Sequence, residues 1–424
     1  MSDIFMIDGF SRLMLIAANA VAFFVLLYSI GYLKGHAKKL KYYILFFLML
    51  IGINGVILTN DLIAMFFFIE IGTLSAYALV AFADGKRELE ASIKYFFMGE
   101  IASLLILFAF GLIYASTGTF NMKEAALNFP LASLPQATAG IKGLIALLLL
   151  IGFGVKSAAV PFHSWLPDAH TSAPSPVSAM LSGVIIKVMG IYALMRIIFN
   201  VIGMTPEIST AMLGLGVVSI LVGGILAVGQ FDMKRLMAYS SISQIGYILL
   251  GFGLANPLGV MGALFHIFNH AFMKSLLFLN AGAVERMAGS RDLRELGGLS
   301  KKMPVTFVSS LIATFSISGI PPFNGFWSKL YIIVGCAYAG NLGLGLVAVI
   351  GSLLTLASFL RVQKYAFFGE LKENLTGVKE VPFFMGASML LLAIICFGVG
   401  IMLPYVMQFV VGPAASAVLG GVGL

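Results

Sequence analysis

The stretch LLLLIGFGVKSAAVPFHSWLP, residues 147–167, sets the class of fold. It begins as an apolar run typical of a membrane helix, yet it contains Lys156, and Pro161 interrupts the helix five residues later. Backbone carbonyls freed by such a break are tolerated in a bilayer only where protein or water covers them, and transporters often place ion sites there. The stretch therefore predicts a broken membrane helix beside an ion site.

The composition of the whole chain agrees with a membrane solvent. Of its 424 residues, 60% are hydrophobic and 10% are charged, and the mean hydropathy is +1.02. The formal charge of +8 comes from residues scattered between apolar spans, so it does not indicate nucleic-acid binding. Cys336 and Cys396 lie in apolar runs without metal-ligand spacing, so we expect no disulfide framework, iron–sulfur cluster or other cofactor in this chain.

The hydropathy pattern predicts an all-α integral membrane fold with about twelve transmembrane helices, in a single domain over residues 1–424. The first run is too long for a removable signal peptide, so we expect it to stay in the membrane. The expected spans lie near residues 9–33, 42–59, 62–83, 91–115, 140–160, 174–199, 208–229, 237–255, 257–280, 304–336, 342–362 and 382–411.

Two similar helix breaks indicate an internal repeat. Pro161-Phe162-His163 resembles Pro322-Phe323-Asn324, and Trp165 or Trp327 follows shortly after. Transporters often contain two inverted repeats with one broken helix in each. We therefore expect two inverted five-helix repeats, about 42–199 and about 208–362, flanked by helices near 9–33 and 382–411.

The distribution of basic residues predicts the orientation. With the N-terminus outside, the inner loops hold 17 of the 26 basic residues, whereas the outer ends hold only Arg12, Lys123, Lys142 and Arg196. By the positive-inside rule, both termini should lie on the outer face of the cell (inner, or cytoplasmic) membrane. The inner set is Lys34, Lys38, Lys39, Lys41, Lys86, Arg87, Lys234, Arg235, Arg286, Arg291, Arg294, Lys301, Lys302, Arg361, Lys364, Lys372 and Lys379.

Five lysines remain inside the expected spans: Lys94, Lys156, Lys187, Lys274 and Lys329. Each would cost roughly 2.5–3.5 kcal/mol at a helix centre facing lipid, or on the order of 12–18 kcal/mol together. They should therefore point into the bundle and meet carboxylates or internal water. Glu70 and Glu100 are the acids in comparable positions, and we assign no role to Glu100 because it does not share a helix face with Lys94.

Each buried charge also has a purely structural interpretation. Glu70 could form only a helix-to-helix hydrogen bond, although a place in an ion path is favoured. Lys187 lies centrally in AMLSGVIIKVMGIYALM, residues 179–195, where reaching an interface is difficult. Lys94 follows Glu90 by four residues near a helix start, so a surface ion pair is a serious alternative.

The stretch LFHIFNHAFMKSLLFL, residues 264–279, places His266, His270 and Lys274 at four-residue steps on one helix face. Two histidines at this spacing could ligate zinc, but an HExxH glutamate and a nearby third ligand are missing. A proton relay is favoured, since histidine titrates near neutral pH. A packed, hydrogen-bonded core imidazole is the alternative for His266.

At HSWLPDAHTSAPSPVSAMLSG, residues 163–183, the sequence closely resembles the signature of the antiporter-like subunits of respiratory complex I, of multisubunit cation/proton antiporters and of energy-converting membrane-bound hydrogenases. Further matching segments are the Glu70 helix, the region around Lys156 and Lys187, and DMKRLMAYSSISQIGY, HIFNHAFMKSLLFLNAG and GIPPFNGFWSKLYII. The resemblance runs from about IDGFSRLM onward.

This resemblance implies a path for protons, and possibly for sodium. Glu70 would pair with Lys156 in a first half-channel, Lys187 would pass protons to His266 and His270, and Lys329 would end the path. The secondary candidates are Lys94, His163, His170 and Lys274. No catalytic, cofactor-binding or metal-ligating residue is expected in this chain.

The resemblance also implies partners. The chain would be a subunit of a redox-driven membrane complex, beside further antiporter-like subunits, lipid and a peripheral redox arm, with no redox chemistry of its own. Relatives commonly begin with two further helices, so another subunit or lipid would cover that surface. The absence of a long amphipathic C-terminal helix argues against the most distal complex I subunit, and a lysine at 329 points weakly to the antiporter or hydrogenase branches.

Three other functions stay open at this stage. A subunit of a redox-free sodium/proton antiporter would differ only in its partners. A stand-alone solute carrier would need a substrate-shaped motif beyond the lysine line. An intramembrane metalloenzyme would have to use His163, His170, His266 and His270, which the family motif explains better.

Overall fold

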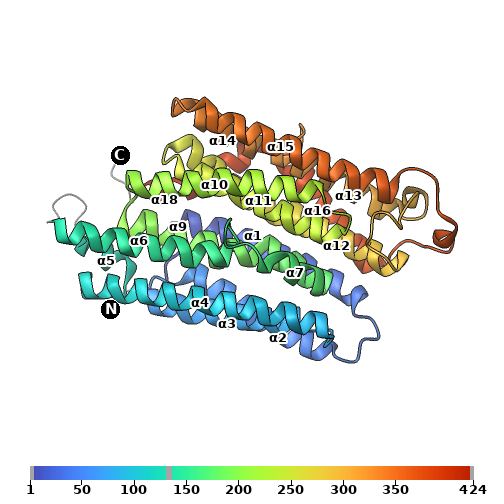
Figure 1. Ribbon diagram of the computed structural model, residues 1–424, viewed down its shortest axis with the longest axis horizontal. Coiled ribbons are helices and arrows are strands. Elements are labelled where there is room, and N and C mark those ends of the chain that lie inside the picture. The colour runs from blue at the N-terminus through green and yellow to red at the C-terminus, as the bar shows by residue number, and fades with distance from the viewer. Residues whose placement is uncertain (1–3, 130–135, 421–424) are drawn as a thin grey trace.

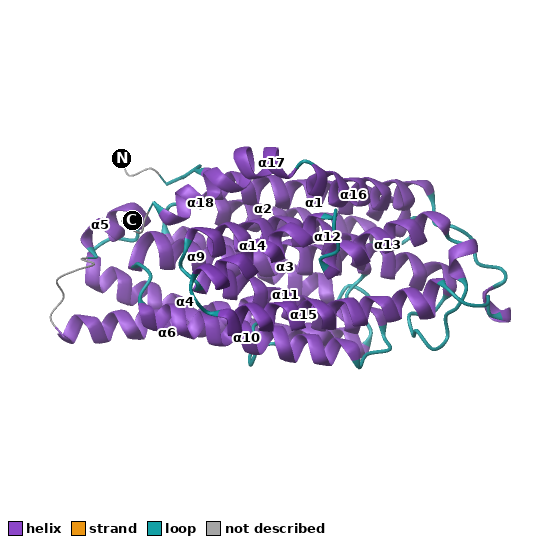
Figure 2. Ribbon diagram, turned by 90° about the horizontal axis from the view of Figure 1, so that it is seen from above, coloured by secondary structure: helices purple, strands orange, loops and turns teal. Residues whose placement is uncertain are grey.

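The computed structural model describes residues 4–129 and 136–420, and this part of the chain consists of helices and loops without a β-strand. The long helices run roughly along one common axis (Figures 1 and 2). This arrangement satisfies backbone N–H and C=O groups within each helix, as a bilayer requires.

The N-terminal half contains four long helices followed by the first broken helix. Its elements are α1 (Gly9–Tyr32), α2 (Lys39–Leu58), α3 (Leu62–Val80), α4 (Lys86–Thr117), α5 (Met122–Asn128), α6 (Gln136–Ser157), α7 (Trp165–Ser172), α8 (Ser175–Met180), the π-helical η1 (Leu181–Tyr192), α9 (Ala193–Ile197) and the π-helical η2 (Ile198–Ile202).

The C-terminal half contains the second broken helix. Its elements are α10 (Pro206–Val228), α11 (Met233–Gly253), α12 (Pro257–Ala288), η3 (Leu299–Lys301), α13 (Pro304–Ser318), α14 (Asn324–Tyr338), α15 (Leu342–Val362), η4 (Gln363–Phe367), η5 (Glu373–Leu375), α16 (Phe383–Ile401), α17 (Leu403–Val406), η6 (Met407–Val411) and α18 (Gly412–Leu419).

Ten helices within the described residues are long and apolar enough to cross a bilayer. The chain is therefore a multi-pass membrane protein. Both expected helix breaks are present, since α6 ends at Ser157 and α13 ends at Ser318. The expected span 304–336 is consequently two shorter helices, and the span 382–411 ends its first helix at Ile401.

Polar side chains fix where several of the helices begin. Asp8, Asp61, Thr205, Asp232 and Asn256 each accept a hydrogen bond from a backbone N–H in the first turn of the following helix. The first N–H groups of a helix lack partners within the helix, so such caps stabilise it by about 1 kcal/mol. These caps explain why short polar loops suffice between long apolar runs.

The centre of the bundle is formed by the helical run Ser175–Ile202, by α11 and by α12, whose residues are almost all buried. Figure 1 shows α2, α3 and α4 along one side of this centre and α14 and α15 along the other. The lysines and histidines predicted for the ion path lie on these central elements or face them.

The two ends of the bundle differ. At one end, the start of α1 packs against α18, where Gly9 touches Pro413, and the Asn200 side chain donates to the Ala417 carbonyl. At the other end lies a cavity of about 420 Å³ whose lining includes four basic residues, Arg87, Lys234, Arg286 and Arg291. The first and last described helix ends thus share one end of the bundle, opposite this basic cavity.

Candidate ion-translocation site

The first helix break holds Lys156 in the last turn of α6. The chain leaves the helix through Ala158, whose φ of 57° lies in the left-handed region. Trp165 turns back and donates its indole N–H to the Val155 carbonyl at 3.0 Å, and its ring stacks on Tyr95 with centroids 4.1 Å apart. One of the carbonyls freed at the break is thereby satisfied, and the end of α6 is held in place.

Glu70 is the charge partner of Lys156, as the resemblance implies. The Lys156 Nζ lies 3.7 Å from the Glu70 Oε1, and the lysine side chain is only 3% exposed. Ser103 on α4 donates its hydroxyl to the same carboxylate oxygen. The Lys156 amine has no hydrogen-bond partner among the described residues. A buried ion pair with such incomplete hydrogen bonding is weak evidence for stability of the fold.

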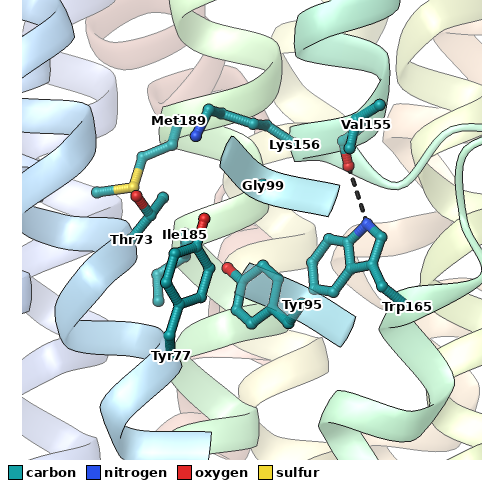
Figure 3. Close-up of a pocket in the computed structure, with 9 residues that line it drawn as sticks. All are labelled: Thr73, Tyr77, Tyr95, Gly99, Val155, Lys156, Trp165, Ile185 and Met189. Carbon is teal, nitrogen blue, oxygen red and sulfur yellow. Dashed lines mark hydrogen bonds between the residues drawn. The ribbon is translucent and has the colours of Figure 1, made fainter. Parts of the chain in front are cut away.

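A small cavity adjoins this pair and reaches toward η1 (Figure 3). Its volume is about 10 Å³, close to the minimum that one water molecule needs. Figure 3 shows the Lys156 amine and the Tyr77 hydroxyl turned toward the same space. The lining residues are Thr73, Tyr77, Tyr95, Gly99, Val155, Lys156, Trp165, Ile185 and Met189.

The second helix break places Lys329 in an arrangement that resembles the first. The helix α13 ends with Gly319 in the left-handed region at φ 80°. Lys329, from the following helix α14, reaches back and donates to the Ile317 carbonyl at 2.8 Å. Each break therefore has a buried lysine beside the C-terminal end of its first half-helix, where the helix dipole favours a positive charge.

Lys187 lies between the two breaks, on the π-helical segment η1. Its side chain is fully buried, and its amine donates to the Ser182 carbonyl five residues earlier. Its charge interacts with that of Lys274 on α12. π-Helical turns are uncommon and often occur at functional sites, because they redirect a side chain and loosen the carbonyl pattern.

The two histidines of α12 continue from Lys187 toward Lys329. Their ring centroids lie 6.0 Å apart, and both side chains are fully buried. The His266 Nδ1 is 2.9 Å from the hydroxyl of Ser328, the neighbour of Lys329. Both Lys187 and Lys329 act electrostatically on His270 and on His266. Lys187, His270, His266 and Lys329 are called the buried line below; its direct contacts are those between the two histidines and between His266 and Ser328.

Two of the secondary candidates form a side branch of this line. The Lys274 amine lies 5.8 Å from the centre of the Phe278 ring and 5.4 Å from that of Phe359. His170 stacks on the same Phe278 ring, with centroids 4.4 Å apart. Neither nitrogen of His170 has a hydrogen-bond partner within the described part of the chain.

The remaining two secondary candidates lie away from the line. Lys94 has a side chain that is 49% exposed and pairs with Glu90 at 2.7 Å and with Asp168 at 3.3 Å. These contacts match the surface-pair interpretation of Lys94. His163 lies in the first break and is only partly buried.

Sequence reasoning misses two buried charge clusters. Arg196, expected at an outer span end, is 1% exposed and paired with Asp8 at 2.7 Å. Lys234, expected in an inner loop, has a side chain that is 3% exposed and pairs with Glu285 at 2.8 Å. The sequence contains one signal for the cluster of Lys234 and Glu285, since Glu285 directly follows the apolar part of α12.

Among residues 4–129 and 136–420, no group of three or more histidine, cysteine or acidic residues could hold a metal ion. Together, the two broken helices and the buried line between them define a polytopic membrane protein with an internal polar axis.

Comparison with known proteins identifies the family. The chain belongs to the NADH:quinone oxidoreductase/Mrp antiporter transmembrane family, whose model matches residues 59–355. A model of the N-terminus of chain 5 of NADH-ubiquinone oxidoreductase (complex I) matches residues 4–43.

Relatives of this chain include components of several membrane complexes. It is 39% identical to a subunit of the NADH-quinone oxidoreductase of Desulforudis audaxviator, over 82% of this chain and 70% of that protein. It is 35% identical to a subunit of the Na(+)/H(+) antiporter of Alkalihalophilus pseudofirmus, over 87% of this chain and 74% of the relative. These relationships agree with the family resemblance read from the motifs.

Solved structures show the same fold. A chain of the Mrp complex from a Dietzia species superposes with a TM-score of 0.88 and 29% identity, over 98% of this chain and 84% of that one. A chain of the archaeal membrane-bound sulfane sulfur reductase superposes with a TM-score of 0.85 and 31% identity, over 97% and 82% of the two chains. This protein is thus an antiporter-like membrane subunit by family and by fold.

Proposed function

We propose that this chain translocates protons, and possibly sodium, as a subunit of a redox-driven membrane complex. The observation that carries the proposal is the buried line formed by Lys187, His270, His266 and Lys329 between two helix breaks. Ionisable groups at membrane depth are costly, and they mark ion pathways when they face a bundle interior. The pair of Glu70 and Lys156 begins the path.

The proposed mechanism is electrostatic. A charge change in a neighbouring subunit would draw Glu70 and Lys156 apart or together. The altered charge at Lys156 would change the proton affinity of Lys187 on η1, and a proton would pass through His270 and His266 to Lys329. The loose ion pair at 3.7 Å, without a hydrogen bond to the Lys156 amine from any described residue, supports a pair that can move.

The proposed topology has about twelve spans and places both termini on the outer face of the cell membrane. Ten apolar helices, with α12 and the broken helix α13–α14 between them, support that number. The basic cavity at the end opposite α18 would face the cell interior under the positive-inside rule. The similar positions of Lys156 and Lys329 at their breaks support two inverted repeats, about 42–199 and about 208–362.

The proposed partners are further antiporter-like subunits, lipid and a peripheral redox arm. The relatives support a place in a multisubunit assembly, since they include subunits of NADH-quinone oxidoreductase and of F(420)H(2) dehydrogenase. Large apolar side chains such as Phe67, Phe97 and Leu104 are exposed on α3 and α4, as expected for a surface that meets lipid or another membrane subunit.

A redox-free sodium/proton antiporter is the second candidate. A specific observation favours it, because the chain superposes on a chain of an Mrp complex with a TM-score of 0.88. The two functions use the same internal axis and differ in what drives it. Identification of the partners that co-purify with the tagged chain from its own membranes separates the two functions. A redox subunit among the partners supports the redox-driven complex, and its absence supports the redox-free antiporter.

Lys329→Ala tests the proposed path in vesicles that contain the native complex. Removing a positioned proton-transfer group should slow proton uptake by roughly 100-fold. The readout is a pH-sensitive dye trapped inside the vesicles. The matched control is Lys94→Ala, because Lys94 is an exposed lysine outside the line. Equal uptake in the Lys329 variant and the wild type would rule out this end of the path.

A further inference from the structure

Glu100, which has no role in the path above, lies beside its first ion pair. It is in the middle of α4, next to Gly99, where α4 packs so tightly on α3 that a methyl group would overlap the Tyr77 hydroxyl. One turn further along the same face, Ser103 donates its hydroxyl to Glu70. The helix α4 therefore presents both Glu100 and Ser103 to the region of the Glu70 carboxylate.

The Glu100 carboxylate interacts with both members of the pair. Glu100 interacts electrostatically with both Glu70 and Lys156, and Lys156 interacts electrostatically with both carboxylates. The Glu100 Oε1 is buried and lacks a hydrogen-bond partner among the described residues. Two carboxylates at short range repel each other when both are ionised, and one proton held by the pair removes that repulsion.

A second observation points to a proton or a water at this place. The Lys156 amine and the Tyr77 hydroxyl are both deeply buried, line the cavity of about 10 Å³ and lack hydrogen-bond partners within the described residues. Figure 3 shows both groups turned toward the cavity. The Lys156 amine can donate hydrogen bonds, and the Tyr77 hydroxyl can donate or accept them. Because both lack partners and lie beside two carboxylates, they form a site suited to exchangeable protons.

Charge balance favours one proton at the site. With both carboxylates ionised and Lys156 charged, the three groups carry a net charge of −1, and one proton shared by the acids brings them to zero. An uncompensated charge is costly at membrane depth. The Glu100 side chain is also partly exposed, and an ionised carboxylate in contact with lipid would be costly.

We propose that Glu70 and Glu100 form a carboxylate pair that stores one proton beside Lys156. This inference rests on the proposed function and specifies its first site. When Lys156 moves away, both acids can be protonated, and when it returns, one proton is released toward the cavity. The proton balance is complete, because each proton gained by the pair replaces the positive charge of the departing lysine.

Infrared spectroscopy of the full chain in native membranes tests the proposal. The wild type at neutral pH should show the carbonyl stretch of a protonated carboxyl group. Glu100→Gln should remove that band, because the remaining Glu70 carboxylate pairs with Lys156 and stays ionised. Glu100→Asp should retain it. Glu90→Gln is the matched control on the same helix, since Glu90 is exposed and pairs with Lys94.

The pH profile of proton uptake gives a second readout. Loss of the neighbouring negative charge should move the acidic limb in Glu100→Gln toward lower pH by about one unit. An unchanged carbonyl band in Glu100→Gln would overturn the proposal. The infrared band does not depend on transport. Its persistence in Glu100→Gln would therefore overturn the carboxylate pair alone, whereas unchanged uptake in Lys329→Ala would overturn the proposed function.

Discussion

Arg196 illustrates how one charged residue is accommodated inside the bundle. Its guanidinium donates to both oxygens of Asp8, at 2.7 and 2.8 Å, to Ser11 and to Tyr192, and it lies over the Phe10 ring. Burial alone would raise the pKa of Asp8, but the hydrogen bonds and charge of Arg196 outweigh burial and lower it to about 2. The pair ties the start of α1 to the helix that carries Lys187.

Asp8→Asn should destabilise the fold by roughly 3 kcal/mol, because the buried guanidinium loses its counter-charge. The folded pKa of Asp8, about 2, is below the ordinary value of 3.8. Its contribution is therefore fully present above about pH 4 and is lost as the pH falls toward 2. Thermal unfolding of the purified chain measures both effects.

The control for this change is Asp84→Asn. Asp84 forms an ion pair with Lys38 in which both side chains are about half exposed, and such surface pairs contribute about 0–1 kcal/mol. The difference in stability between wild type and Asp8→Asn should shrink between about pH 4 and pH 2. A difference that stays constant over that range would mean that the Asp8 charge does not act through Arg196.

At the scale of single residues, the sequence predicts which lysines are buried more reliably than which partners they have. Lys156, Lys187, Lys274 and Lys329 are buried as expected from their central positions. The sequence places Arg196 at an outer span end but does not reveal that its side chain is buried against Asp8, the N-cap of α1. The sequence assigns no role to Glu100 because its own helix offers no partner. The charges with which it interacts, Glu70 and Lys156, lie on α3 and α6.

At the scale of elements, the close approach of η1 to the first break is tightly constrained. A Cβ at Gly190 would lie 2.8 Å from the backbone nitrogen of Ser157, which directly follows Lys156. Backbone atoms cannot move aside as a flexible side chain can. The absence of a side chain at Gly190 therefore fixes the spacing between the segment of Lys187 and the end of α6.

Gly190→Ala should destabilise the protein by about 1–3 kcal/mol through overpacking. It should also slow proton uptake, because η1 must move away from α6, which increases the distance between Lys156 and Lys187. Thermal unfolding and dye uptake in vesicles measure the two effects. Gly111→Ala on α4 is the control, since nothing lies within 4 Å of its added Cβ, and alanine favours a helix by about 1 kcal/mol. Equal stability and uptake in the two variants would refute the contact.

Helix breaks are predictable from the sequence, whereas π-helical turns are not. Prolines near 161 and 322 remove backbone donors, so the ends of α6 and α13 follow from local chemistry. The segment η1 has the same apolar pattern as an α-helix, so its sequence does not indicate the wider turns. Sequence periodicity therefore predicts its position but not its geometry.

At the scale of the whole molecule, the long motifs predict the family and fold, because a match from residue 163 to residue 183 is specific. The number of spans follows less directly. Helices such as α13 and α14 are each 15 residues long and together replace one expected span. Length and hydropathy alone cannot distinguish a broken span from two separate segments. The partners of the chain also lie beyond its own sequence.

The central claim is that buried lysines and histidines carry protons across the membrane, and Lys187→Ala tests it most directly. The measurement is proton uptake by vesicles that contain the complex, with Lys123→Ala as a control because Lys123 is exposed near the start of α5. We predict that uptake falls by roughly 100-fold in Lys187→Ala and is unchanged in Lys123→Ala. Wild-type uptake in a correctly assembled Lys187→Ala complex would contradict the claim.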